Sequence, residues 1–98
     1  MKDNDLQTRN LFRGIAEVDY IKDNRKIVPL ELNLPIGEVP RIEHFIQAIK
    51  RDFNIDVEIR DFVRMEFRPL LGESNYTIRS IRILRTEKDT TYAKVTRI

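Results

Sequence analysis

The sequence contains no cysteine, which excludes disulfide bonds, thiolate zinc sites and cysteine nucleophiles. No apolar run approaches the ~20 residues that cross a bilayer. The first ten residues, MKDNDLQTRN, lack the apolar stretch of a secretory signal. Together these absences favour a soluble protein in a reducing compartment, and we expect a cytoplasmic protein without membrane contact.

Residues suited to catalysis and metal binding are also scarce. The single histidine, His44, has no second metal ligand at helical spacing. Neither Ser74 nor Ser80 lies in a Gly-x-Ser-x-Gly motif, and the three glycines are too scattered for a phosphate-binding loop. Asp56 and Glu58 share a face of a predicted strand, but a solvated face is favoured over an acid/base pair. We therefore expect no catalytic residue, no cofactor, no metal and no small-molecule substrate.

The length and the composition of the chain are sufficient for one folded domain. The chain has 98 residues, of which 41% are hydrophobic and 35% charged. A chain of this length holds one hydrophobic core, and this composition lies on the folded side of the boundary with disorder. We expect a flexible N-terminal tail at residues 1–10 and a single α+β domain at residues 11–98.

Two strands with alternating apolar and polar residues are predicted near the N-terminus, at residues 12–20 and 26–34. In both, the apolar side chains occupy even positions. A two-residue loop would place the two apolar sets on opposite faces. A three-residue loop at residues 23–25 pairs Tyr20 with Val28 and keeps one apolar face. We predict this loop, closed by a residue with positive φ.

A helix is predicted at residues 39–53, where the apolar spacing changes from two residues to three and four. Pro40 suits the first turn and Asn54 suits the end. The opposite face is charged or polar and is expected to contact solvent. The predicted buried face consists of Ile42, Phe45, Ile46, Ile49 and Phe53.

The second half of the chain predicts three further strands. Residues 57–71 read as one long strand with apolar odd positions, and a turn follows at residues 72–75. In the next strand, residues 76–86, the alternation breaks, so either a β-bulge reverses the strand or both faces are partly covered. A charged turn at residues 87–89 precedes a last strand at residues 92–98.

The predicted order is β-β-α-β-β-β. It indicates an α+β, two-layer fold in which one helix packs on a four- or five-stranded sheet, mixed or antiparallel. The ubiquitin-like β-grasp has a similar strand-strand-helix-strand opening, and this likeness of architecture carries no function.

Arginine is concentrated in the second half, where residues 55–98 contain seven arginines and two lysines. Arg60, Arg64 and Arg68 fall on the polar face of the predicted strand 57–71, spaced about 13 Å apart at ~3.3 Å per residue. Such a stripe could follow a phosphate backbone, although cross-strand arginine–glutamate pairs are the favoured alternative. Asp61 lies on the predicted core face, which requires a partner such as Arg82 or a position beyond the helix. The candidate partner-binding residues are Arg60, Phe62, Arg64, Arg68, Arg79 and Arg85.

One helix cannot cover both faces of a sheet. A set of apolar residues is therefore predicted to point away from the helix, namely Leu11, Ile15, Ile21, Phe62, Leu70 and part of residues 76–86. Scattered exposure is the alternative, but a continuous patch indicates a protein partner. We hypothesise a non-catalytic protein–protein interaction or accessory module, homodimeric through the helix-free sheet face or through an edge at Pro29. Nucleic-acid binding by an arginine-lined sheet face is the alternative.

Overall fold

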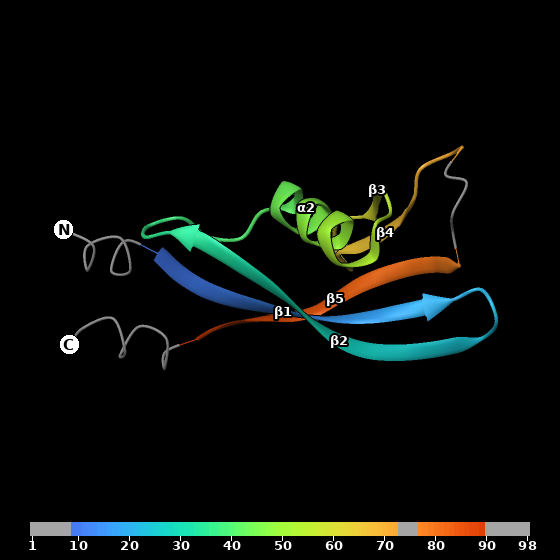
Figure 1. Ribbon diagram of the computed structural model, residues 1–98, viewed down its shortest axis with the longest axis horizontal. Helices are drawn as coiled ribbons and strands as arrows, with labels where there is room; N and C mark the ends of the chain where they lie inside the picture. The colour runs from blue at the N-terminus through green and yellow to red at the C-terminus, as the bar shows by residue number, and fades with distance from the viewer. Residues whose placement is uncertain (1–8, 73–76, 90–98) are drawn as a thin grey trace.

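The computed structural model describes residues 9–72 and 77–89. Five antiparallel strands form one open sheet in the order β2-β1-β5-β4-β3, with one helix packed on it (Figure 1). The elements are β1 (Arg9–Tyr20), β2 (Asn24–Pro35), α2 (Ile42–Phe53), β3 (Val57–Asp61), β4 (Glu66–Pro69) and β5 (Ile78–Lys88). The predicted α+β class and two-layer arrangement are confirmed, and the sheet is antiparallel, not mixed. β1 begins two residues before the predicted domain boundary.

The hairpin of β1 and β2 has the predicted loop length but a different register. Residues 21–23 form the loop, and Asp23 closes it with a φ of 57°. Aspartate tolerates this left-handed conformation better than most residues. Val28 consequently pairs with Ala16 and not with Tyr20. The predicted register is wrong by an even number of residues, so the predicted faces are retained.

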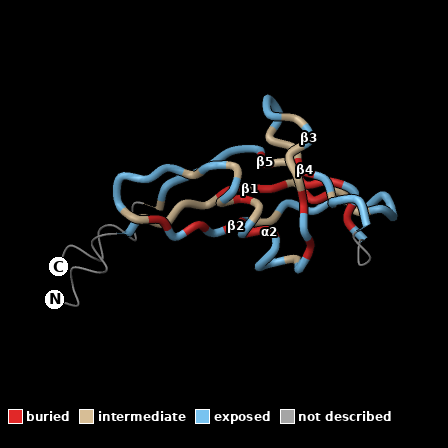
Figure 2. Tube along the Cα trace, turned by 90° about the horizontal axis from the view of Figure 1, so that it is seen from above, coloured by how far each residue is buried: buried red, intermediate tan, exposed pale blue. Residues whose placement is uncertain are grey.

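The core lies between α2 and one face of the sheet, where buried residues run along the middle of the strands (Figure 2). Even positions of β1 and β2 face the helix, as predicted. All five predicted helix residues belong to or pack against the core. Gly14 is required here because a Cβ atom at this position would lie 2.7 Å from Cε1 of Phe45. The side chains with least exposure are Ala16, Val18, Leu30, Ile49, Phe67 and Ile81.

Both ends of α2 have a local cause. At the N-terminus, the backbone N–H of Arg41 donates to Nδ1 of His44 at 2.9 Å, which holds Arg41 as an extended N-cap. Pro40 therefore precedes the helix, and its predicted place in the first turn is wrong. At the C-terminus, Asn54 adopts a left-handed φ of 56° and its N–H donates to the Lys50 carbonyl at 2.9 Å. The predicted stop at Asn54 is confirmed.

The long strand predicted at residues 57–71 is wrong, because the chain folds back into the hairpin of β3 and β4. Residues 62–65 form the turn. Ile59 pairs with Phe67, so odd positions face the core on both strands. A hairpin with this register produces the same alternation as one continuous strand, and the alternation could not distinguish them.

β5 contains the predicted bulge. Its register with β1 shifts at two places, between Asp19 and Tyr20 and between Ile15 and Ala16. These shifts turn Ile78, Ile81 and Ile83 to the core although their positions differ in parity. The strand also continues through Lys88, so the charged turn predicted at residues 87–89 is wrong. The predicted strand at residues 92–98 and most of the predicted turn at 72–75 lie outside the described residues.

Candidate interaction surfaces

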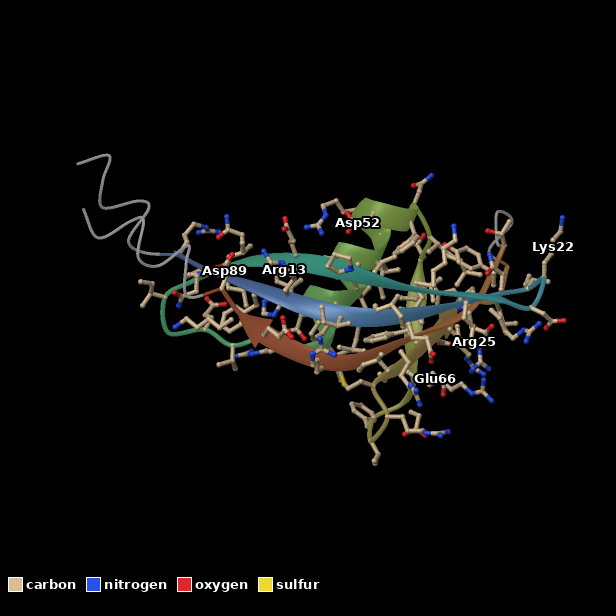
Figure 3. All side chains as sticks on the ribbon, turned by 90° about the horizontal axis from the view of Figure 1, so that it is seen from below. Arg13, Lys22, Arg25, Asp52, Glu66 and Asp89 are labelled. Carbon is tan, nitrogen blue, oxygen red and sulfur yellow. The ribbon has the colours of Figure 1, made fainter. Side chains whose placement is uncertain are left out.

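The helix-free face of the sheet carries charges that are paired with one another. Odd positions of β1 and β2 point to this face, where arginines and carboxylates lie among apolar residues such as Ile15 and Ile27. Arg13 and Asp89 meet near one end of the sheet (Figure 3). The exposed pairs, Arg68–Glu58 and Arg85–Glu87, contribute about 0–1 kcal/mol each to stability, whereas Arg13–Asp89 and Arg82–Glu17 are partly buried. The closest pairs are Arg13–Asp89 at 3.2 Å, Arg82–Glu17 at 3.3 Å, Arg68–Glu58 at 2.9 Å and Arg85–Glu87 at 2.7 Å.

The six candidate partner-binding residues do not form one stripe, because the strand expected to carry four of them is a hairpin. Arg68 and Arg85 are paired with glutamates. Arg79 donates to the Ile21 carbonyl at 2.9 Å and lies 3.5 Å from the Asp23 carboxylate. The other three, Arg60, Phe62 and Arg64, lie at the turn between β3 and β4, and neither of these arginines has an ion pair with any described residue.

The predicted outward apolar residues are dispersed. Leu11 and Ile15 are half-buried on the helix-free face of β1. Ile21 lies in the β1–β2 loop, Leu70 follows β4 and Leu84 lies at the bulge of β5. On the face opposite α2, Ile15 pairs with Pro29, and Ile27, two residues before Pro29 on β2, is 57% exposed.

A pocket of about 270 Å³ lies on the same face, where β4 meets β5. Its lining is electrically balanced between three carboxylates and three guanidinium groups. Nε of Arg82 is buried there and has no hydrogen-bond partner in the described ranges 9–72 and 77–89. No group of three or more His, Cys, Asp or Glu among the described residues could hold a metal ion. The lining residues are Glu17, Asp19, Arg25, Arg64, Glu66, Ser80 and Arg82, of which Arg25 and Glu66 are labelled in Figure 3.

Asp61 builds the turn between β3 and β4. Its Oδ1 accepts the backbone N–H of Val63 at 3.0 Å and that of Arg64 at 3.2 Å. Met65 follows with a φ of 50°, and its N–H donates to the Phe62 carbonyl at 3.3 Å. An aspartate that bonds to the backbone two residues ahead is a local turn former. This role explains the polar residue on the predicted core face. Of the two alternatives for Asp61, the pairing with Arg82 does not occur, because Arg82 pairs with Glu17.

The turn exposes two apolar side chains between two arginines that form no ion pair with the part of the chain that the structure describes. Phe62 is 68% exposed and Val63 is 94% exposed. Arg60 and Arg64 flank them, and the turn projects from the side of the sheet (Figure 2). We call Arg60, Phe62, Val63 and Arg64 the apolar turn. Sequence reasoning missed Val63 because it assigned that residue to the core, and Asp61 two residues earlier was the signal for a turn.

One charged pair on the exposed face of α2 has shifted pKa values. Nε of Arg51 donates to Oδ1 of Asp52 at 2.7 Å. This hydrogen bond lowers the pKa of the Asp52 carboxyl and raises the pKa of the Arg51 guanidinium. The pair lies away from the apolar turn and provides a titratable probe of the helix.

Comparison with known proteins finds no match among family models, curated proteins or solved structures. Among the described residues, no helix combines the length and apolar character that crossing a membrane requires. Function is therefore inferred from the geometry of the surfaces.

Proposed function

We propose that the protein is a non-catalytic module that binds another protein through the apolar turn. The observation that supports this proposal is the exposure of Phe62 and Val63 between two arginines that have no ion pair within residues 9–72 and 77–89. Burial of exposed apolar surface favours association with a partner. Aromatic residues and arginine are also enriched at the energetic centres of protein interfaces. The apolar turn combines both residue types at one projecting position.

The turn is also organised before binding. Hydrogen bonds from the backbone to Asp61 fix the conformation of residues 62–65. A rigid turn loses less conformational entropy on binding than a mobile loop, which favours affinity. The two guanidinium groups favour a partner with an apolar pocket and carboxylates around its rim.

Self-association through the same surface is a special case of the proposal. The predicted homodimer uses the helix-free face or the edge at Pro29, and a homodimer through the apolar turn is a further version of it. Sedimentation equilibrium across a wide concentration range tests this version. A monomer at every concentration removes the homodimer and leaves binding to a different protein.

Nucleic-acid binding is the competing function, and one observation favours it. In the sequence Phe62 lies between Arg60 and Arg64, neither of which has an ion pair among the described residues, and this arrangement could stack a base and contact phosphates. Against it, four arginines of the helix-free face are already paired with carboxylates. Titration with single-stranded DNA and RNA at low salt tests it, because counterion release favours binding there most. The absence of binding under these conditions ends this alternative.

The proposal is tested with surface variants that preserve the fold. The tagged protein is used to isolate a partner, and the purified partner is then titrated with Phe62→Ser/Val63→Ser and with Ile36→Ser. Ile36 is 56% exposed and lies outside the turn, so it is the matched control. We expect the double variant to lose about 30-fold or more in affinity, as truncation of an interface centre does. Equal affinity of the two variants would contradict the proposal.

A further inference from the structure

The pocket of about 270 Å³ on the helix-free face, which we call the charged pocket, lies beside a bulge of β5. Asp19 of β1 is opposite Ser80 of β5, but Tyr20 is opposite Ile78, so the register shifts between them. Bulges re-aim side chains and are frequent beside functional sites. Ser80 lines the charged pocket and is 9% exposed, the one buried polar residue of the described ranges. A ligand in this pocket would therefore contact a buried hydroxyl group.

Arg82 lies between two carboxylates of the charged pocket. It is opposite Glu17 of β1 on one side and opposite Glu66 of β4 on the other. Its Nη2 donates to Oε1 of Glu17 at 3.3 Å, whereas its Nε is buried and has no hydrogen-bond partner in residues 9–72 and 77–89. A buried N–H group without an acceptor is destabilising. An oxygen atom of a ligand would supply the acceptor.

Most of the charges that line the charged pocket neutralise one another. Asp19 lies 3.7 Å from a guanidinium nitrogen of Arg25 and 3.7 Å from one of Arg79. Glu17 pairs with Arg82, as described above. Two charges of the lining are left over, one of each sign.

These two charges belong to Arg64 and Glu66, which form no ion pair with any residue that the structure describes. They stand on either side of Met65, which has a left-handed φ of 50°. The backbone N–H of Arg64 donates to Asp61 at 3.2 Å, so the backbone that carries both side chains is held in place. Residues two apart have Cα atoms within ~7 Å of each other. An unpaired cation and an unpaired anion thus lie within the reach of one small molecule.

The size and the charge of the pocket limit the class of ligand. Its volume of about 270 Å³ is below the roughly 300–1,000 Å³ of pockets for drug-sized ligands. Three guanidinium groups and three carboxylates line it, so neither a simple anion nor a simple cation is favoured. A small molecule with one positive and one negative group complements Glu66 and Arg64 together. Glu66 and Arg25, which come from different strands of this lining, lie near each other in Figure 3.

We propose that the charged pocket binds a small zwitterion of the chemical class of the free α-amino acids. Its carboxylate accepts hydrogen bonds from Arg64 and from Nε of Arg82, and its ammonium group donates to Glu66. The sequence alone predicts no such ligand, because the lining comes from four strands and a turn that are distant in the chain. The charged pocket shares Arg64 with the apolar turn but does not include Phe62 or Val63. The inference therefore goes beyond the proposed function and does not depend on it.

The test begins with the full ¹⁵N-labelled chain and a panel of free amino acids, each at up to about 10 mM, because weak ligands bind in the millimolar range. We expect at least one amino acid to shift the backbone amides of Ser80, Arg82 and Glu66. The N-acetyl derivative of that amino acid lacks the positive charge, and its amide derivative lacks the negative charge. Each derivative is expected to bind about tenfold or more weakly than the parent, because each leaves one charge of the pocket without a partner.

Paired variants locate the site. Arg64→Gln and Glu66→Gln remove the two unpaired charges, and each is expected to lower affinity about tenfold or more. Arg60→Gln removes the arginine on the other side of the same turn, outside the charged pocket, and is expected to change affinity less than about twofold. Glu43→Gln, at an exposed position of α2, is the matched control for Glu66→Gln. The amide spectrum of each variant before titration checks that the fold is retained.

Three results would overturn the inference. One is that no amino acid shifts the amides of the charged pocket, as expected if Arg64 and Glu66 pair with each other instead. Another is that a blocked derivative binds as tightly as its parent, which would exclude recognition of a zwitterion. The last is that Phe62→Ser/Val63→Ser loses the ligand as fully as Arg64→Gln, which would place binding at the apolar turn. The first two results leave the proposed function standing, because neither involves a protein partner.

Discussion

The two faces of the sheet are built from alternate residues of the same strands, yet they have opposite characters. On the face covered by α2, Val18 and Ile81 pair across β1 and β5 and are fully buried. One position earlier on β1, Glu17 pairs with Arg82 and the two form an ion pair on the other face. The alternation thus supplies a core on one side and balanced charge on the other. The exposed apolar pair Phe62 and Val63 lies in the turn between β3 and β4. In a turn, the alternation of a strand does not assign a side chain to either face of the sheet.

The largest expected effect is the difference in stability between two variants of the β3–β4 hairpin, one at a core phenylalanine and one at a phenylalanine of the turn. Phe67 has no exposed surface and Phe62 is 68% exposed. Phe67→Ala should lower the free energy of unfolding by about 3–5 kcal/mol, whereas Phe62→Ala should change it by about 0.5 kcal/mol or less. Chemical denaturation measures both. Similar losses for the two variants would show that the turn packs against the core.

The next effect tests the contact between β1 and α2. Gly14→Ala would place a Cβ atom 2.7 Å from the ring of Phe45. We expect a loss of about 1–3 kcal/mol, the usual cost of overpacking a core. Phe45→Leu in the same chain should make the added methyl group less costly, so the double variant should lose less than the sum of the single losses. Additive losses would show that the destabilisation by Gly14→Ala does not come from contact with the Phe45 ring.

A smaller effect is expected at the base of the apolar turn. Asp61→Ala removes the acceptor of two backbone N–H groups and should cost about 1 kcal/mol. Asp61→Asn keeps an acceptor oxygen and should retain most of the stability. Faster amide hydrogen exchange at Val63 and Arg64 in the alanine variant alone would confirm the role of the carboxylate. Unchanged exchange in that variant would contradict it.

The smallest effect is electrostatic. Because the pKa of Asp52 is lowered in the folded chain, its stabilising contribution is present above the ordinary value of 3.8 and disappears as the pH falls through the lowered pKa. The pair is exposed, so the contribution should be about 0.3 kcal/mol or less. Asp52→Asn should remove this part of the pH dependence below about pH 4. Unfolding curves of both proteins from pH 2 to 7 measure the difference, and identical pH profiles would contradict the assignment.

Much of the architecture could be predicted from the sequence because it depends on periodicity. The alternation in β1 and β2, the apolar face of α2 and the stop at Asn54 all follow from local patterns. The bulge of β5 was also visible as a break in alternation. The predicted faces stay correct when the predicted register is wrong by an even number of residues, because such a shift leaves each side chain on its face.

What could not be predicted depends on single contacts or on where a strand turns. The hairpin of β3 and β4 preserves the parity of Val57 and Phe67, so alternation does not show the turn between them. The closeness of Gly14 to Phe45 is a tertiary contact without a local signal. As a result, three of the candidate residues were placed on one strand, and Val63 was placed in the core. Their grouping at the apolar turn required the structure.

The central claim is that the apolar turn is covered by a protein partner. Hydroxyl-radical footprinting of the free chain and of its complex with the isolated partner tests it most directly. In the free chain, Phe62 should be oxidised while Phe45 and Phe67, which are buried, should not. In the complex, Phe62 should become protected while Ile36 stays as reactive as before. Unchanged oxidation of Phe62 in the complex would contradict the account.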